Sequence, residues 1–247
     1  MTTDLHARTI TLAGFGGDAI ETYVAEPQSP QRVGSVVVIH HMPGYDEATK
    51  EIARKFAAAG YAAAVPNLYS REAPGASSDD AAAAARALGG VPDERLVGDV
   101  EAAMNYLRER PESNGKVAVI GYCSGGRQSV LAACSLPFDA AVDCYGAFVV
   151  VDPPSGAPTK ATSLLEKLTE LRCPLLGLFG ADDQYPSPEQ TEVLRQRLSE
   201  LGKEFEFHTY DDAAHSFFSV DRPSYRPDVA VKAWAEIWTF FATHLHS

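Results

Sequence analysis

The sequence predicts one α/β domain built on a mainly parallel sheet with helices on both faces. Short apolar segments alternate with amphipathic ones along most of the 247 residues, and this alternation is typical of strand–helix repeats that cover both sides of a sheet. Hydrophobic residues make up 45% of the chain, which is enough for a full core. No linker-like run divides the sequence, so we expect residues 1–247 to form a single domain without a large cap domain.

An antiparallel hairpin is expected at the start of the sheet. The turn-rich residues 13–18 separate two apolar segments, Thr9–Leu12 and Ile20–Val24. The other strands are expected at Val36–His40, Ala62–Val65, Val117–Gly121, Ala140–Tyr145, Leu175–Gly180 and Phe205–Tyr210. The helices are expected at Glu47–Ala59, Glu94–Arg110, Ser124–Cys134, Ser187–Leu201 and Pro227–His244.

Two stretches interrupt the alternation, Tyr69–Pro92 and Ala147–Lys160. Each follows an expected strand, and ligands of open parallel sheets bind beyond the carboxyl ends of the strands. We therefore expect these loops to form the rim of a pocket. For the second stretch, which contains three prolines, a plain surface connection is an equal alternative.

Charge and composition limit the class of partner. The net charge of −12 does not suit nucleic acid or an anionic membrane, because phosphate binding needs a surplus of Lys and Arg. The chain has neither a basic start followed by an apolar run nor an 18-residue apolar stretch, so a cytoplasmic protein is expected. Its four cysteines form no CxxC pair, and no His stands at zinc spacing. We expect no disulfide, metal or cofactor and a small molecule as the partner, and the sequence predicts no particular oligomeric state.

A candidate nucleophile lies at the junction of a strand and a helix. Residues Val117–Gly126 read as a buried strand that runs directly into a helix, with Cys123 between Gly121 and Gly125. This is the pattern of a nucleophile elbow, in which small residues let the strand and helix backbones pass close together. The positive end of the helix favours a thiolate, so Cys123 is predicted to be reactive. The five-residue pattern alone is only moderately specific.

The partners of this cysteine follow in the order that α/β-hydrolases use, acid before histidine. Asp182 and Asp183 come after the strand that ends at Gly180, and His215 lies in the loop after the last strand. We predict a Cys123–His215–Asp183 triad. Asp183 is preferred to Asp182 because its spacing leaves room for the chain to turn back, but the neighbouring residue stays an alternative. His208 alternates with apolar residues in a strand, so an edge position is expected for it.

Two backbone amides are expected to form an oxyanion hole. Attack on an ester carbonyl needs donors aimed at the developing negative charge. The amide of Ser124 follows the nucleophile, and Met42 lies in the His-His-Met-Pro-Gly turn after the strand that ends at His40.

With these residues in place, the chain resembles the dienelactone hydrolase family, compact α/β-hydrolases that carry Cys-His-Asp instead of Ser-His-Asp. The resemblance implies opening of the lactone carboxymethylenebutenolide to maleylacetate through an acyl-enzyme, which water then hydrolyses. It covers nearly the whole chain and rests on Gly60–Tyr69, Asn114–Val117, Gly121–Gly126 and Ala214–Phe217.

The chain departs from that family at two positions. The resemblance implies a glutamate beside the cysteine and an arginine four residues after the histidine; His41 and Ser219 stand there. His41 is expected to touch Cys123 and to hold it as a thiolate or hydrogen-bond to it. A neutral ester or lactone therefore fits as well as dienelactone, and no single arginine can be assigned to a substrate carboxylate. Aromatic side chains are candidates for the pocket wall, namely Tyr69, Tyr122, Tyr145, Phe217 and Phe218.

Two other functions remain open from the sequence. A thioesterase or acyltransferase could use the same triad, because an acyl-enzyme does not reveal which nucleophile resolves it. A protein that binds a small molecule without catalysis is the third possibility, since fold alone does not define activity. Intact Cys, Asp and His in the required order favour an enzyme, a carboxylic-ester hydrolase.

Overall fold

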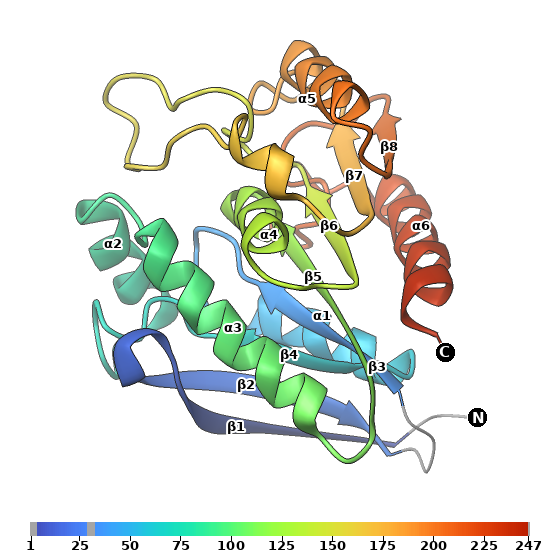
Figure 1. The fold of residues 1–247 in the computed structure, drawn as a ribbon. Helices are drawn as coiled ribbons and strands as arrows, with labels where there is room; N and C mark the ends of the chain where they lie inside the picture. The colour runs from blue at the N-terminus through green and yellow to red at the C-terminus, as the bar shows by residue number, and fades with distance from the viewer. Residues whose placement is uncertain (1–3, 29–32, 247) are drawn as a thin grey trace.

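A computed structural model describes residues 4–28 and 33–246, and all of its strands belong to one sheet (Figure 1). The strand order is β1-β2-β4-β3-β5-β6-β7-β8; β1 pairs with β2 and β2 with β4 antiparallel, and all other neighbours are parallel. This confirms the predicted α/β class and the hairpin at the start. The strands are β1 Leu5–Ala13, β2 Ala19–Pro27, β3 Val33–Ile39, β4 Ala62–Pro66, β5 Ser113–Tyr122, β6 Ala140–Cys144, β7 Leu175–Gly180 and β8 Phe205–Tyr210.

Helices cover both faces of the sheet, as the alternating pattern predicts. Helices α1 and α6 pack on one face, whereas α2, α3, α4 and α5 contribute to the core on the other. None of the helices described is both long and apolar enough to cross a bilayer. The helices are α1 Glu47–Ala58, α2 Ser78–Ala87, α3 Asp93–Glu109, α4 Ser124–Ser135, α5 Pro188–Glu200 and α6 Pro227–Leu245, with two 3-10 turns, η1 Phe15–Gly17 and η2 Lys167–Glu170.

The central strand β3 shows how the two-residue period of a strand divides the core. Val36 and Val38 pack with α1 and α6, while Val37 and Ile39 pack with the helices of the opposite face. All four side chains are fully buried. A strand buried on both faces reads as a continuous apolar run, and this explains why the segment is recognisable in the sequence.

The expectation that Tyr69–Pro92 is irregular was wrong for its centre, where helix α2 forms. Ser77 caps the helix by accepting a hydrogen bond from the Asp80 amide, and Asp79 and Asp80 lie in its first turn. The alanines that follow have the highest helix propensity of all residues. Strand β3 also ends at Ile39, one residue earlier than expected, so His40 belongs to the loop.

Candidate active site

Three strand ends bring Cys123, Asp183 and His215 to the same edge of the sheet. Cys123 joins β5 to α4, Asp183 lies in the turn after β7, and His215 lies in the loop after β8. Strands β5, β6, β7 and β8 are parallel neighbours, so their carboxyl ends meet at one edge. This topology brings side chains together that are far apart in the sequence.

Cys123 occupies a strained turn that only close packing can hold. Its backbone has φ 57° and ψ −120°, a conformation that L-residues rarely adopt. A Cβ at Gly121 would lie 1.8 Å from the Gly125 carbonyl oxygen, and a Cβ at Gly125 would lie 2.5 Å from that of Ile39. Both glycines therefore have the steric role expected of them. The Cys123 amide donates to the Cys144 carbonyl at 3.0 Å and fixes the elbow to β6.

The imidazole of His215 is paired with Asp183, not with Asp182. Its Nδ1 lies 2.8 Å from Oδ2 of Asp183, whose side chain is almost fully buried. Asp182 is exposed, and its amide donates to the Ala213 carbonyl at 2.9 Å. The buried carboxylate orients the ring, so that the other ring nitrogen is left for Cys123.

Charge at the site favours a protonated imidazole. Burial lowers the pKa of His215, but the hydrogen bond with Asp183 and the contact with Cys123 outweigh it and raise the pKa to about 10. The negative carboxylate of Asp183 contributes to this shift, because it favours the charged form of the ring. The arrangement suits an imidazolium at His215.

A second loop, residues 40–44, faces the elbow and is fixed by a buried histidine. His40 donates from Nδ1 to the His41 carbonyl at 2.9 Å and accepts at Nε2 from the Leu68 amide at 3.3 Å. Burial lowers the pKa of His40 to about 4, so the ring is neutral and can accept that bond. The Tyr69 hydroxyl donates to the Met42 carbonyl at 3.1 Å. These bonds hold Met42 opposite the elbow.

A cavity of about 80 Å³, which we term the Cys123 cavity, opens beside the candidate nucleophile. Both stretches that interrupt the strand–helix alternation contribute to its wall, as expected of a rim. Met42, Ser124 and Tyr69 also lie in this wall, and Ser124 is the first residue of α4, where the amide has no partner within the helix. The wall includes Met42, Tyr69, Arg86, Ser124, Phe148 and Ala161.

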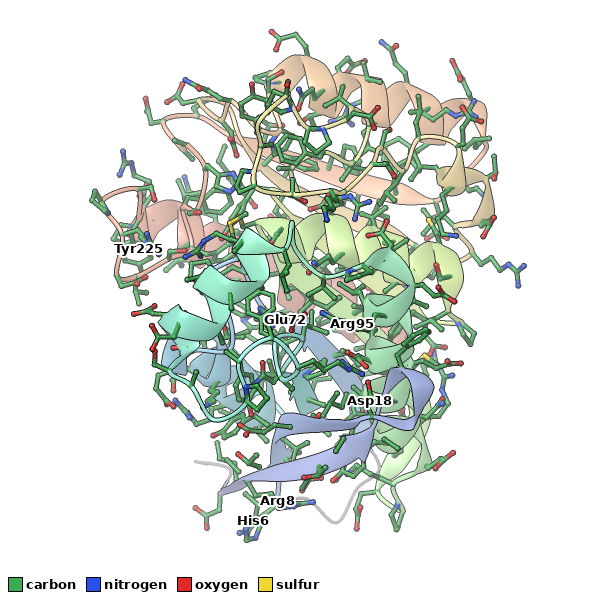
Figure 2. The ribbon with its side chains drawn as sticks, turned by 90° about the vertical axis from the view of Figure 1, so that its left-hand side faces the viewer. His6, Arg8, Asp18, Glu72, Arg95 and Tyr225 are labelled. Atoms are coloured by element: carbon green, nitrogen blue, oxygen red, sulfur yellow. The ribbon has the colours of Figure 1, made fainter. Side chains whose placement is uncertain are left out.

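Arg86 differs from the other arginines near this rim because it forms no ion pair with any described residue. Arg71 binds Asp99 at 2.7 Å. Arg95 is paired with Glu72, and both side chains are labelled in Figure 2. Arg86 is thus a cation in the cavity wall that is available to an anionic ligand.

Arg127 also lines this cavity, but its charge is already compensated. Its two terminal nitrogens lie 2.9 Å from the two carboxylate oxygens of Asp93. A bidentate pair of this kind is among the strongest that side chains make. Arg127 therefore has a structural role at the rim.

Five of the predicted pocket residues lie outside this wall. Phe217 is fully buried in the core and lines no part of the Cys123 cavity. His41, Tyr122, Tyr145 and Phe218 line a different cavity of about 120 Å³, which we term the aromatic cavity. Its wall includes His41, Tyr122, Tyr145, Phe218, Ser219 and Trp234.

His41 is held by a carboxylate. Its Nε2 lies 2.6 Å from Oδ2 of Asp46, the residue that caps α1 by accepting from the Thr49 amide at 2.8 Å. The partner in the structure is therefore Asp46, whereas the sequence led us to expect Cys123. The capping position of Asp46 explains why its carboxylate points toward this loop.

Two residues near the site were missed from the sequence, His40 and Asp143. Asp143 is fully buried at the end of β6; its Oδ1 accepts from the Gly146 amide at 2.7 Å, and Oδ2 has no partner among the described residues. Burial raises the pKa of Asp143 to about 7, although the Gly146 hydrogen bond and the charge of His215 act against the rise. The sequence contained one signal for Asp143, namely an acidic residue between apolar residues of an expected strand.

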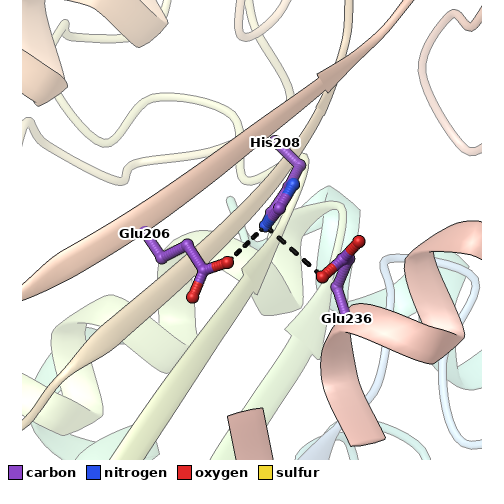
Figure 3. A group of neighbouring side chains, drawn as sticks. All are labelled: Glu206, His208 and Glu236. Atoms are coloured by element: carbon purple, nitrogen blue, oxygen red, sulfur yellow. Dashed lines mark hydrogen bonds and ion pairs between the residues drawn. The ribbon is translucent and has the colours of Figure 1, made fainter. Parts of the chain in front are cut away.

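One group of side chains in the described part of the chain could supply three metal ligands, and it lies away from the Cys123 cavity. Glu206, His208 and Glu236 meet between β8 and α6 (Figure 3). His208 Nε2 lies 2.7 Å from Oε1 of Glu206 and 3.7 Å from Oε2 of Glu236. These contacts account for the positions of the side chains without an ion, and His208 is on the edge strand, as predicted.

The parallel sheet, the elbow and the acid and histidine on later strand ends together define an α/β-hydrolase fold. The family model "Dienelactone hydrolase family" matches residues 20–245. The carboxymethylenebutenolidase of Pseudomonas putida is 30% identical over 234 residues, which cover 91% of each chain. The crystal structure of a candidate dienelactone hydrolase from Klebsiella pneumoniae superposes with a TM-score of 0.85 at 25% identity, covering 97% of this chain and 99% of that one.

A more distant structure has the same fold. A dienelactone hydrolase-like promiscuous phosphotriesterase from metagenomic libraries gives a TM-score of 0.74 at 21% identity, covering 98% of this chain and 99% of that one. The chain belongs to the dienelactone hydrolase family and is a hydrolase.

Proposed function

We propose that this enzyme hydrolyses carboxylic esters or lactones through a covalent acyl-cysteine intermediate. Cys123 is the nucleophile, His215 the acid and base, and Asp183 the residue that orients His215. The observation that carries the proposal is a cysteine on a strained elbow that interacts with a histidine whose Nδ1 lies 2.8 Å from a buried carboxylate. Nucleophile, base and orienting acid in contact are the signature of covalent catalysis.

The resting site holds a thiolate and an imidazolium. The position of Cys123 at the start of α4 supports this state, since the positive end of a helix favours a thiolate. The raised pKa of His215 keeps a proton on the imidazole at neutral pH. No base is then required to start the reaction. The imidazolium is instead ready to act as a general acid.

In the first half of the reaction, the Cys123 sulfur bonds to the carbonyl carbon and the π electrons move to the carbonyl oxygen. The amides of Ser124 and Met42 stabilise this oxyanion. When the carbonyl re-forms, the bond to the alcohol oxygen breaks and His215 delivers its proton to that oxygen. For a lactone, the alcohol stays attached to the acyl group as the opened chain.

In the second half, water replaces the alcohol. Neutral His215 removes a proton from the water as its oxygen bonds to the acyl carbon. Collapse of this second tetrahedral intermediate breaks the carbon–sulfur bond, releases the acid and restores the thiolate–imidazolium pair. Asp183 keeps the ring in one tautomer through both halves.

Arg86 supports a substrate whose acyl part carries an anionic group. It is the cation in the wall of the Cys123 cavity with no described carboxylate partner. Charge-assisted hydrogen bonds contribute about 1.5–3 kcal/mol each. Replacing Arg86 should therefore reduce kcat/KM roughly tenfold to a hundredfold for an anionic substrate, and leave a neutral one nearly unchanged.

The covalent intermediate is tested with p-nitrophenyl acetate. Wild-type protein is expected to release a burst of nitrophenolate equal to the enzyme concentration, and mass spectrometry of the quenched protein is expected to find the acetyl group on Cys123. Cys123→Ala is the matched control and should give neither. A wild type that behaves like Cys123→Ala would overturn the proposed function.

The role of Arg86 is tested by comparing phenyl hydrogen succinate with phenyl acetate. Arg86→Gln should lose activity on the succinate ester alone. Arg222→Gln removes the same charge from an exposed side chain outside the wall of the Cys123 cavity and is the matched control. Equal losses in both variants would mean that general electrostatic attraction, and not a contact with Arg86, selects the anion.

A further inference from the structure

The aromatic cavity and the Cys123 cavity are lined by adjacent residues of the same two segments, the loop after β3 and the elbow after β5. Two pairs of sequence neighbours carry this arrangement. His41 lines the aromatic cavity and Met42 the Cys123 cavity; likewise, Tyr122 lines the first and Cys123 the second. A substrate bonded to Cys123 therefore has two spaces into which its two halves can extend.

The position of His215 indicates which cavity receives the alcohol half of the substrate and which receives the acyl half. The Tyr145 ring in the wall of the aromatic cavity packs against the imidazole, with ring centroids 5.1 Å apart. The segment from Phe218 to Asp221, which follows His215 closely in the chain, lines the same cavity. A general acid must lie within hydrogen-bond reach of the oxygen that it protonates. The leaving oxygen must therefore be on the side of the aromatic cavity.

The chemistry of the aromatic cavity favours an uncharged group. Rings of Tyr122, Tyr145, Phe218 and Trp234 dominate its wall. The charged residues at this cavity, Glu51, Lys55 and Asp221, are exposed and so belong to its rim.

The size of the cavity limits what it can hold. Its volume is about 120 Å³, and an apolar cavity of roughly 150 Å³ is known to hold benzene. One ring or a short branched chain is therefore the largest group that fits without movement of the wall.

We propose that the aromatic cavity binds the leaving alcohol, a small uncharged aryl or branched alkyl group, while the acyl half occupies the Cys123 cavity. This inference rests on the proposed function. It makes the natural substrate an ester of two separate halves, or a lactone whose alcohol portion carries an apolar substituent. Ser219 and the loop at His41 then determine specificity for the alcohol.

Filling the aromatic cavity tests the assignment. Ser219→Phe is measured on methyl acetate and phenyl acetate, and each rate is divided by the wild-type rate on the same ester so that intrinsic reactivity cancels. We expect kcat/KM for the phenyl ester to fall roughly tenfold or more relative to the methyl ester. The deacylation rate should stay the same, because both esters give one acetyl-enzyme that no longer contains the alcohol.

A second variant fills the cavity from another wall, in case Ser219→Phe does not fold. Ala48 lies on α1 and also lines the aromatic cavity, so Ala48→Phe should give the same selective loss. Ala161→Phe in the Cys123 cavity is the mirror control. It should change the deacylation rate and the preference between acetate and butyrate esters, with little effect on the choice of alcohol.

The outcomes separate this inference from the proposed function. A burst that persists while both filled variants treat methyl and phenyl esters alike, or a change in deacylation in those variants, would overturn the assignment of the alcohol site alone. Absence of a Cys123-dependent burst in the wild type would instead overturn the covalent mechanism on which the assignment rests.

Discussion

Replacing Asp143 by Asn should stabilise the protein at alkaline pH and not at acidic pH. The carboxyl group is fully buried and its Oδ2 has no hydrogen-bond partner among the described residues. Its pKa is raised from the ordinary 3.8 to about 7 by burial. The folded protein thus keeps a proton that the unfolded chain releases, so stability falls as pH rises from about 4 and levels off above the folded pKa.

The size of the effect follows from that interval. Each pH unit between the two pKa values changes the free energy of unfolding by about 1.4 kcal/mol. Between pH 5 and the folded pKa of about 7, the wild type should lose about 3 kcal/mol through Asp143. Asn does not titrate, and its carbonyl oxygen can keep the bond from the Gly146 amide. The constant cost of its extra amide group cancels when the two pH values are compared.

Urea unfolding at pH 5, 6, 7 and 8 measures this difference. The free energy of Asp143→Asn minus that of the wild type should rise by about 3 kcal/mol over the range. The raised pKa of His215 adds stability that falls as pH rises from about 6.5 to about 10, and this contribution cancels when the two proteins are compared. Asp211→Asn, at an exposed position, is the matched control. Parallel curves for Asp143→Asn and wild type would refute the reasoning.

Three further predictions concern the site itself. Asp183→Asn removes the strongest partner that favours the imidazolium form of His215. The pH at which iodoacetamide alkylation of Cys123 reaches half its maximum should therefore shift, and acylation should slow about a hundredfold or more. An unchanged alkylation profile would contradict the role of His215 as the ion-pair partner of Cys123. His41→Ala should leave alkylation at pH 6 to 7 within about twofold, because His41 is held by a different carboxylate; a large decrease would show that it stabilises the thiolate. Gly121→Ala should prevent stable folding, since its Cβ would lie 1.8 Å from a backbone oxygen; a soluble variant with wild-type thermal stability would contradict the close approach at the elbow.

The parts of the site that could be predicted from the sequence are those fixed by local structure. The elbow needs a strand, a small residue, the candidate nucleophile, a second small residue and a helix, all within ten residues. Strand β3 was equally readable, because a strand buried on both faces is a continuous run such as Val36–Ile39. The choice between Asp182 and Asp183 was more difficult, since the two are adjacent. Only the bond between Asp183 and the His215 ring separates them.

The side-chain directions at strand ends could not be predicted, because the regular alternation of a strand stops there. Tyr145 has φ 45°, and Ser216, the residue before Phe217, has φ 65°. A positive φ at these positions redirects the chain at an aromatic side chain or just before one. Tyr145 consequently turns toward the aromatic cavity, and Phe217 turns into the core. Helix α2 was missed for a related reason, since a run of small residues in a Gly- and Pro-rich stretch gives no apolar face from which to recognise a period.

The two departures from the family pattern, His41 and Ser219, have a common explanation in the structure. In the sequence, His41 and Ser219 are far apart and suggest only that a charged substrate contact has been lost. In the structure they line one cavity, and that cavity adjoins the histidine that would protonate the alcohol. The cation available to a substrate, Arg86, lies in the other cavity. The departures therefore alter the space for the alcohol and leave a cation on the acyl side, so leaving-group selectivity is the property in which we expect this enzyme to differ most from its relatives.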